Sequence, residues 1–271
     1  MSAPGFRRAK RSLGQNFLVD PNLQRKIVEA LGAGPDDEVL EVGPGRGALT
    51  RHLLGRVRRL VLVELDDALA AELGAAYGDR ADVEVVHGDV LRVRLADHVR
   101  DASRLRVVGN IPYNITTPIL FRLLERPRPA EVVLMVQDEV AERIVAEPGT
   151  KAYGALAVGV QSVARAERLF GVGRSAFRPV PRVDSAVVRV RPLRPEPLTE
   201  AEEARLRVLV RAAFQWRRKQ IGKILRGHPD LRVPTEQAEE LLERLGVSAS
   251  ERPERLAPET FMSLSRRLTV A

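Results

Sequence analysis

The segment Glu-Val-Leu-Glu-Val-Gly-Pro-Gly-Arg-Gly, residues 38–47, joins an apolar β-rich run to a cluster of glycines, and a helical pattern follows it. Glycines at a strand-to-helix turn let the backbone approach a ligand that would collide with any Cβ atom. The next apolar run ends at Glu64, 21 residues after Gly43. An acidic side chain there can accept both ribose hydroxyls of an adenosine-containing cofactor. This segment therefore predicts a cofactor loop.

The spacing of Gly43, Gly45 and Gly47 bears on which cofactor the loop binds. Dinucleotide sites typically read G-x-G-x-x-G, with a helix amino terminus facing a pyrophosphate. Here the spacing is G-x-G-x-G after Glu41, which fits S-adenosylmethionine better because this cofactor has no pyrophosphate. The loop alone leaves a NAD site or a structural turn open. Asp89 follows the third predicted strand, where it can accept from a cofactor adenine amine or close an Asx turn.

Apolar β-rich runs alternate with helical patterns from residue 21 to about residue 191. This alternation predicts βαβ units and an α/β fold with a parallel sheet covered on both faces. A Pro-rich connection joins the last two runs, which could pair as an antiparallel hairpin at the sheet edge. The expected strands are Glu38–Val42, Leu60–Glu64, Val83–His87, Leu105–Gly109, Val132–Gln137, Arg168–Val172 and Ala186–Arg191, and the expected helices include Arg46–Arg56, Asp66–Tyr77 and Thr116–Leu124.

The Pro-rich stretch at residues 191–197 marks a change in composition, because it cannot continue a helix or a central strand. Only helical patterns follow it, and Thr199 with Glu202 reads as a capping box at the start of the first. We therefore expect an α/β domain over residues 1–197 and a small all-helical domain over residues 198–271. The expected helices of the second domain are Thr199–Trp216, Glu236–Leu245 and Pro258–Leu268.

Composition excludes several classes of protein. The 271 residues suit one large and one small domain, and the absence of cysteine excludes disulfides and thiolate metal sites. The four histidines show no helical ligand spacing, so we expect no metal site. No apolar run reaches the roughly 18 residues of a membrane span, and the amino terminus does not read as a secretory signal. We expect a cytoplasmic protein that acts as a monomer.

The net charge of +8 is unevenly distributed. Basic clusters indicate a polyanionic partner, although charge runs are also common on solvated faces. Trp216 lies beside one cluster, where it could stack on RNA or serve as a packing anchor. The candidate nucleic-acid contacts are Arg7, Arg8, Lys10 and Arg11 in the amino-terminal arm, and Arg217, Arg218, Lys219 and Lys223 in the carboxyl-terminal part.

The tetrapeptide Asn110-Ile-Pro-Tyr113 ends the fourth predicted strand and is the most specific signal in the chain. The lone pair of adenine N6 is delocalised into the ring, so this nitrogen is a poor nucleophile. Two acceptors aimed at its hydrogens, the Asn110 side-chain oxygen and a main-chain carbonyl near Pro112, would turn the lone pair toward a sulfonium methyl. Tyr113 offers a flat face to a flipped-out base. The alternative is a proline turn with a buried tyrosine.

With these residues in place, the chain resembles the KsgA family of ribosomal RNA adenine dimethyltransferases, sisters of the Erm macrolide-resistance methyltransferases. The similar segments follow one another in order between residues 12 and 219. They are Ser12–Leu18, the glycine loop Leu40–Gly45, the catalytic loop Asn110–Pro118, the segment Phe177–Ser185 and the basic segment Phe214–Lys219, which resembles a helix that opens the family's second domain.

The resemblance implies a class I, Rossmann-like methyltransferase fold with a seven-stranded, mostly parallel sheet and a helical RNA-recognition domain. It implies S-adenosylmethionine-dependent dimethylation of N6 of two adjacent adenosines in the 3′-terminal hairpin of small-subunit (16S) ribosomal RNA, with the small ribosomal subunit as partner. Residue-wise transfer assigns cofactor binding to Asn16, Leu18, Gly43, Gly45, Glu64, Asp89 and Asn110, and the target base to Asn110, Pro112, Tyr113 and Phe177. Without the family, Phe177 reads more readily as a plug at the sheet edge.

Other functions stay open at this point. Ile111 is the residue typical of Erm proteins, which keeps a large-subunit RNA activity in view, whereas the Phe177–Ser185 and Arg-Arg-Lys segments favour the KsgA side. A DNA N6-adenine methyltransferase usually needs a larger recognition domain than the helical residues left here. An assembly or transcription factor that kept the fold has no reason to retain Asn110, Glu64 and Asp89 together. A NAD-linked dehydrogenase is the weakest alternative.

Overall fold

The computed structural model describes residues 15–268, so the candidate contacts Arg7, Arg8, Lys10 and Arg11 lie outside the described residues. The described chain groups into two compact units. Residues up to Ala141 with Glu167–Arg191 form the first, and Glu142–Ala166 with the residues from Pro192 onward form the second. The predicted division at residue 198 assigns Glu142–Ala166 to the first domain, whereas in the structure apolar side chains of this stretch, such as Tyr153, pack in the helical core.

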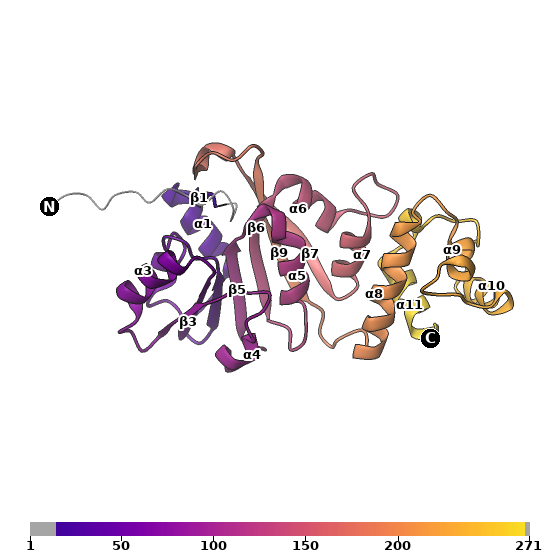
Figure 1. Cartoon of the computed structure of the whole chain (residues 1–271), viewed down its shortest axis with the longest axis horizontal. Helices are drawn as coiled ribbons and strands as arrows, with labels where there is room; N and C mark the ends of the chain where they lie inside the picture. Colours follow the sequence, from indigo (N-terminus) through magenta and orange to yellow (C-terminus); the bar gives the residue numbers. More distant parts are fainter. Residues whose placement is uncertain (1–14, 269–271) are drawn as a thin grey trace. The chain divides into compact units, whose positions relative to one another are not determined.

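A seven-stranded sheet in the order β4-β3-β2-β5-β6-β9-β7 organises the first unit (Figure 1). The pairs from β4 through β6 are parallel, and β9 runs antiparallel to β6. This confirms the α/β class and the mostly parallel sheet, with the last two strands side by side at one edge. The strands are β2 (Glu38–Val42), β3 (Arg59–Glu64), β4 (Val83–His87), β5 (Leu105–Asn110), β6 (Glu131–Gln137), β7 (Ala164–Val172) and β9 (Ser185–Pro192).

The central strands are buried along almost their whole length because helices and loops cover both faces. A separate two-stranded pair, β1 (Phe17–Leu18) with β8 (Phe177–Arg178), joins the start of the described chain to the segment between β7 and β9. The remaining elements of this unit are α1 (Pro21–Leu31), α2 (Thr50–Leu53), α3 (Asp67–Tyr77), α4 (Leu95–His98), the 3-10 turns η2 (Tyr113–Ile115) and η3 (Arg174–Ala176), and α5 (Thr116–Leu123).

Helix α2 is much shorter than the expected helix Arg46–Arg56. Gly47 has a left-handed φ of 72°, so a right-handed helix can begin only after it. Gly55 has a φ of 70° and stops the helix at the other end. The glycines that shape the loop therefore limit the helix to four residues, Thr50–Leu53.

The second unit is helical. Its core contains Phe214 stacked on Phe261 at 6.0 Å, and the Tyr153 hydroxyl donates to the Leu256 carbonyl at 2.7 Å. The capping box of Thr199 and Glu202 is present as expected. No helix within residues 15–268 is long and apolar enough to cross a membrane. The helices are α7 (Ala155–Gln161), α8 (Glu200–Gln215), α9 (Ile221–Gly227), α10 (Thr235–Arg244), η4 (Pro253–Arg255) and α11 (Pro258–Arg267), while α6 (Asp138–Val145) crosses from one unit into the other.

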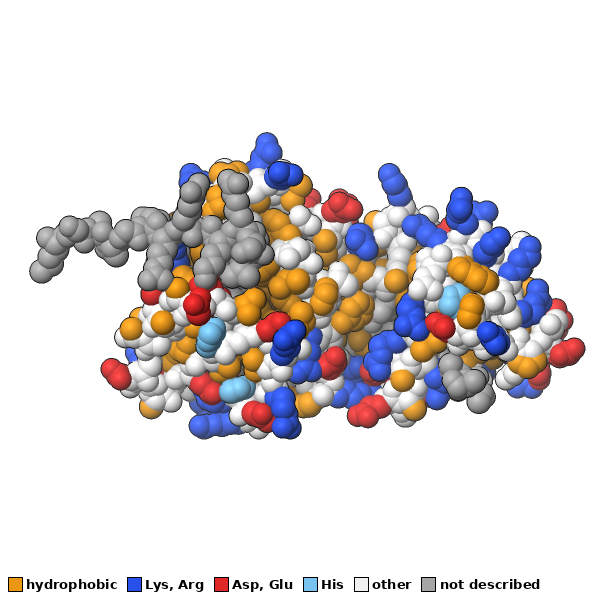
Figure 2. Space-filling model, in the orientation of Figure 1, with side chains coloured by type: hydrophobic (Ala, Val, Ile, Leu, Met, Phe, Trp, Pro, Cys, Tyr) orange, Lys and Arg blue, Asp and Glu red, His pale blue; other side chains and the backbone are white. Residues whose placement is uncertain are grey.

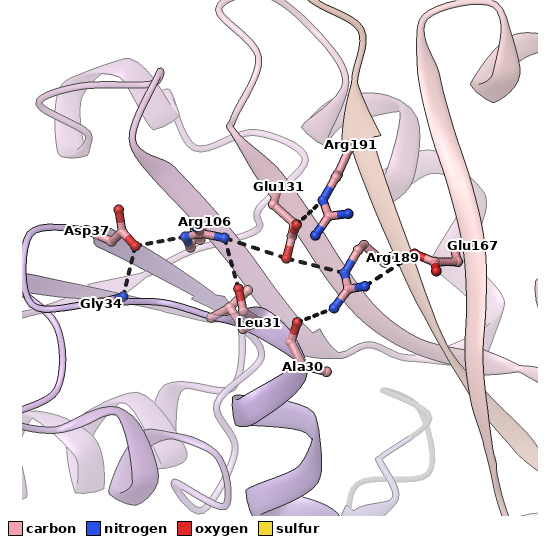
Figure 3. Close-up of polar contacts among 9 residues, drawn as sticks. All are labelled: Ala30, Leu31, Gly34, Asp37, Arg106, Glu131, Glu167, Arg189 and Arg191. Carbon is pink, nitrogen blue, oxygen red and sulfur yellow. Dashed lines mark hydrogen bonds and ion pairs between the residues drawn. The ribbon is translucent and has the colours of Figure 1, made fainter.

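A buried carboxylate organises the edge of the sheet at which the parallel strands begin and the antiparallel strand β9 ends (Figure 3). Glu131, the first residue of β6, is only 3 % exposed and contacts the guanidinium groups of Arg106, Arg189 and Arg191. Arg189 also donates to the Ala30 carbonyl at 2.7 Å. Arg106 extends the network to the α1 end by donating to the Leu31 carbonyl at 3.0 Å. One carboxylate thus ties β5, β6, β9 and the end of α1 together.

We expect Glu131→Gln to lower the free energy of unfolding by about 3 kcal/mol, because the substitution removes the one buried carboxylate that Arg106, Arg189 and Arg191 share. Glu167→Gln is the matched control, since Glu167 also contacts Arg189 but its side chain is 58 % exposed. Its cost should stay near 0.5 kcal/mol, about that of a surface ion pair. Urea unfolding of both variants measures the difference, and equal losses would contradict the central role of Glu131.

Candidate active site

A cavity of about 490 Å³ opens at the carboxyl ends of the parallel strands. The strand order reverses at β2, which has β3 on one side and β5 on the other. Ligands of open α/β sheets bind in the crevice at such a reversal. All of the predicted cofactor residues lie in the cavity wall, together with Pro112: they are Asn16, Leu18, Gly43, Gly45, Glu64, Asp89 and Asn110.

The glycine loop after β2 has the backbone that its residues predict. Gly43, Gly45 and Gly47 have φ values of 63°, 58° and 72°, a region that side chains with a Cβ rarely adopt. A Cβ atom on Gly45 would lie 3.2 Å from the ring of Phe17. Glycine at position 45 therefore keeps the loop tight against the start of the described chain and leaves the cavity open.

Glu64 ends β3 with its carboxylate fixed by two main-chain donors. The Gly45 N–H and the Asp66 N–H each donate to it at 2.9 Å, one to each oxygen. Burial raises the pKa of Glu64, and these two hydrogen bonds act in the opposite direction. Because each carboxylate oxygen has further acceptor capacity, Glu64 can still accept hydroxyl donors from the cavity.

Asp89 combines both roles considered from the sequence. Its Oδ1 accepts from the Leu91 N–H at 3.0 Å, which is an Asx turn, and its side chain also lies in the cavity wall. The guanidinium of Arg92 lies 3.9 Å from Oδ2. The turn therefore positions the carboxylate at the cavity end formed by the loop after β4.

Asn110, the last residue of β5, has an oriented side chain. Its Nδ2 donates to the main-chain carbonyl of Asn16 at 2.9 Å. An amide has its donors on nitrogen and its acceptor on oxygen, so a bond that engages Nδ2 leaves Oδ1 as the acceptor. Asn16 thus belongs to the cavity wall and also sets the direction in which Asn110 accepts.

Tyr113 lies in η2, directly after the strand-ending loop, and is held at its far end. Its hydroxyl lies 2.6 Å from the Ser185 Oγ on β9. Burial raises the pKa of Tyr113, the hydrogen bond with Ser185 lowers it, and the nearby Asp184 carboxylate raises it again. The Pro112 carbonyl accepts from Ile115 and Thr116 within the same loop, at 3.3 Å each. The ring is therefore held in one orientation, next to the wall residues Pro112 and Asn114, although Tyr113 is itself absent from the cavity wall.

The structure departs from the prediction at Phe177. This ring is fully buried in the core of the first unit, and it is absent from the cavity wall. Its residue pairs with Leu18 in the β1–β8 ribbon, which turns the side chain inward. In this structure Phe177 therefore packs at the sheet edge, and its ring would have to move before it could stack on a base, so its role at the target base stays a prediction.

The carboxyl-terminal basic cluster also differs in its local structure. Arg217, Arg218 and Lys219 lie in the turn that follows α8, not on a helix, and they are exposed. Lys223 is exposed on α9. Trp216 is 36 % exposed and lies edge-on to His228 at 5.0 Å, a packing contact that leaves part of the ring accessible.

Sequence reasoning gave no role to Glu41, which is 2 % exposed in the cavity wall. Its carboxylate accepts from the Thr50 hydroxyl at 2.7 Å. Burial raises the pKa of Glu41 to about 7, the Thr50 hydrogen bonds lower it, and the neighbouring Glu64 raises it. The sequence feature that could have pointed to Glu41 is an acidic side chain in the interior of an apolar strand, directly before the glycine loop.

The cavity fits S-adenosylmethionine. Its volume is in the usual range for small-molecule sites, and Glu41, Glu64 and Asp89 place three carboxylates around a cofactor that carries a sulfonium and an ammonium group. Arg46 and Arg51 are the basic residues of the wall, so acidic groups prevail. Arg46 is engaged with the Phe17 ring, with 4.4 Å between the guanidinium carbon and the ring centroid.

Comparison with known proteins gives concordant results. The family model described as ribosomal RNA adenine dimethylase matches residues 6–269. The chain is 42 % identical over 264 residues to a ribosomal RNA small subunit methyltransferase A of Geobacter metallireducens, covering 96 % of each chain. A relative with the same description from Chlorobium chlorochromatii is 45 % identical over 212 residues, or 78 % of this chain and 79 % of that one.

Solved structures agree in fold. A dimethyladenosine transferase from Plasmodium falciparum superposes with a TM-score of 0.78 at 27 % identity, covering 92 % of this chain and 95 % of that one. The 23S rRNA methyltransferase ErmE superposes with a TM-score of 0.71 at 31 % identity, covering 93 % and 99 %. Both agree with the Rossmann-like methyltransferase fold expected from the sequence.

The raised pKa of Glu41 makes stability depend on pH. Between 4.5 and about 7 the folded protein keeps the Glu41 proton while the unfolded chain releases it, so the folded state binds more protons in this window. The free energy of unfolding therefore falls as pH rises through the window and levels off above it. Glu41→Gln cannot titrate and keeps an acceptor for Thr50, so it should gain stability relative to the wild type, by about 3 kcal/mol from pH 4.5 to pH 8.

Urea unfolding of both proteins across this pH range measures the gain. Glu139→Gln, at an exposed carboxylate, is the control and should give a flat difference. A Glu41→Gln difference that is the same at every pH would show that the carboxyl does not titrate in this range.

Proposed function

Because the chain belongs to the ribosomal RNA adenine dimethylase family, we propose that it dimethylates N6 of two adjacent adenosines in the 3′-terminal hairpin of small-subunit ribosomal RNA, using S-adenosylmethionine, during ribosome biogenesis. The observation that carries the chemistry is the bond from Asn110 Nδ2 to the Asn16 carbonyl, because it leaves an amide oxygen in the cavity wall as an acceptor for an exocyclic amine. The enzyme works in the cytoplasm, where ribosomal subunits are assembled.

S-adenosylmethionine supplies an electrophilic methyl group on a positively charged sulfur. Glu64 accepts the ribose hydroxyls with a carboxylate already oriented by Gly45 and Asp66. Asp89, also in the cavity wall, would accept from the adenine amine. Asn16, Leu18, Gly43 and Gly45 form the walls against which the cofactor lies.

Asn110 and its loop activate the attacking nitrogen. Asn110 Oδ1 accepts one N6 hydrogen, and a main-chain carbonyl accepts the other, which localises the lone pair on nitrogen. The Pro112 carbonyl already accepts two bonds inside the loop, so the second acceptor is the carbonyl of Ile111, whose direction Pro112 fixes. No carboxylate base is needed, because N6 becomes acidic once it has been methylated.

Tyr113 provides the face on which the flipped adenine stacks. Its hydroxyl bond to Ser185 holds the ring in one orientation, so little conformational entropy is lost when the base arrives. Pro112 precedes it and restricts the same loop. Tyr113 and Asn110 thus hold the base by its face and by its edge.

The small ribosomal subunit is the particle that the relatives favour. The curated relatives at 42 % and 45 % identity are described as acting on the small subunit, whereas the large-subunit enzyme ErmE is 31 % identical. The helical unit, Glu142–Ala166 with the residues from Pro192 onward, contacts RNA through Arg217, Arg218, Lys219 and Lys223. In this proposal the enzyme acts as a monomer.

A methylation assay tests this function. The protein and labelled S-adenosylmethionine are incubated with small subunits from a methylation-deficient strain, with large subunits and duplex DNA in parallel, and nucleosides are resolved by mass spectrometry. We expect N6,N6-dimethyladenosine in small-subunit RNA alone, and a loss of about 100-fold or more in kcat for Asn110→Ala. Calorimetry with the cofactor shows whether that variant still folds and binds.

Dimethyladenosine found only in large-subunit RNA would mean that the protein has the Erm-type activity instead. Absence of transfer to any RNA, despite cofactor binding, would overturn the enzymatic function on ribosomal RNA.

Reversing the basic cluster should weaken particle binding. The variant Arg217→Glu/Arg218→Glu/Lys219→Glu should raise KM for small subunits about tenfold at low salt, with a smaller effect at high salt, because phosphate contacts are screened. Arg207→Glu/Arg211→Glu/Arg244→Glu makes the same charge change at other exposed arginines of the helical unit. Equal effects of the two variants would mean that net charge, not the cluster, sets KM.

A further inference from the structure

Two valines project from the segment between η3 and β9. Val180 is 53 % exposed and Val183 is 44 % exposed, which places them among the most exposed large apolar side chains of residues 15–268. A single exposed apolar residue needs no explanation, but two on one short segment beside a cavity call for one. We define the valine segment as Arg178–Asp184.

The valine segment lies at the edge of the sheet that carries the cofactor cavity. At its start, Phe177 is buried and pairs with Leu18, a cavity-wall residue. At its end, Ser185 pairs with Gln137 at the carboxyl end of β6 and bonds to the Tyr113 hydroxyl. One anchor therefore touches the cofactor side of the site, and the other touches the tyrosine on which the base stacks.

Internal contacts hold the segment in shape. The Asp184 carboxylate accepts from the Arg174 N–H at 2.9 Å, which closes the loop at its base. Arg178 Nη1 donates to the carbonyls of Ser175 at 3.0 Å and Phe177 at 2.7 Å. Pro179 and the buried Pro181 restrict the backbone on both sides of Val180. The valines are thus presented by a stiff support rather than a free loop.

The charge around the valines indicates the kind of partner. Arg174, Arg178 and Arg182 lie close to them in the sequence and are exposed, and Asp184 is the only carboxylate of the valine segment. Hydrophobic and basic side chains lie next to one another at the top of Figure 2, over the segment between β7 and β9. Structured RNA offers stacked bases flanked by phosphates beside a target nucleotide. Apolar side chains can contact such bases, and neighbouring arginines can bind the phosphates.

We propose that Val180 and Val183 form an apolar wedge that enters the RNA stack at the position vacated by the flipped adenosine, while Arg174 and Arg182 hold the flanking phosphates. This inference rests on the proposed methylation of an RNA hairpin. Flipping costs unstacking energy, and proteins that unstack nucleic acids commonly insert apolar side chains between bases. Phe177 is buried in this structure, so the exposed Val180 and Val183, with Pro179 beside them, are the apolar side chains that the segment offers to RNA.

The test measures flipping separately from chemistry. The particle's RNA hairpin carries 2-aminopurine in place of one target adenosine, and its fluorescence rises when the base leaves the stack. With wild-type protein and cofactor we expect this rise on binding. Val180→Ala/Val183→Ala should reduce the rise to less than half at saturating protein. It should also lower kcat/KM on the unmodified substrate about tenfold or more.

Rescue and control variants make the test specific. An RNA with an abasic site next to the target is already unstacked there, so the double variant should recover most of its rate on it. Phe121→Ala removes an apolar side chain of similar exposure, 38 %, outside the cavity wall and should leave both readouts unchanged. Thermal unfolding confirms that the variants are folded.

Each outcome has a distinct meaning. Wild-type protein that methylates no RNA would defeat the proposed function itself. Normal flipping and normal rates in the double variant, with an active wild type, would overturn the wedge alone. Lost binding with a full fluorescence rise in the bound fraction would also overturn it, because the valines would then be a docking surface for RNA or for a ribosomal protein.

Discussion

The reversal of strand order at β2 is the constraint on which the site depends. Because β2, β3, β4 and β5 are parallel, their carboxyl ends meet at one edge. The chain runs from β2 to β3 and β4 on one side and then returns to β5 on the other side of β2. The loop after each strand then contributes one function: the glycine turn after β2, Glu64 at the end of β3, Asp89 after β4 and Asn110 at the end of β5. The parallel arrangement of the strands is therefore enough to bring residues that are far apart in the sequence into one cavity.

The same constraint explains how much could be predicted from the sequence. Apolar runs of strand length, each ending in a polar residue with a chemical use, located the sheet and the cofactor wall. The failures lie where tertiary packing overrides local pattern. Phe177 turned inward because Leu18, from the start of the described chain, pairs with it, and no local signal reports that pairing. Residues 142–166 read as part of the α/β domain by order along the chain, yet their apolar side chains pack among the later helices.

The two ends of the parallel strands have different roles: one end stabilises the sheet, and the other carries the cofactor cavity. At the edge where the parallel strands begin, Glu131 and its three arginines form ion pairs that link β5, β6 and β9. At the carboxyl ends, three left-handed glycines shape the loop after β2, and burial raises the pKa of both Glu41 and Glu64, which is an unfavourable environment for a charged carboxylate. Local violations of this kind concentrate at functional sites, because the surrounding fold stabilises them. An acidic, partly desolvated wall suits a cationic cofactor and makes the empty cavity less stable than an apolar one.

Charge then divides the site into two sides. The cavity wall is acidic and attracts the sulfonium and ammonium of the cofactor, whereas the valine segment outside it is basic and attracts phosphate. A phosphate that entered the cavity would meet Glu41, Glu64 and Asp89, and a cofactor that docked outside would meet Arg174, Arg178 and Arg182. Asn110 and Tyr113 lie at the boundary, on the loop between the two sides, and both offer groups suited to a neutral base. The uncharged base is therefore the part of the RNA that can cross from the basic side into the acidic cavity.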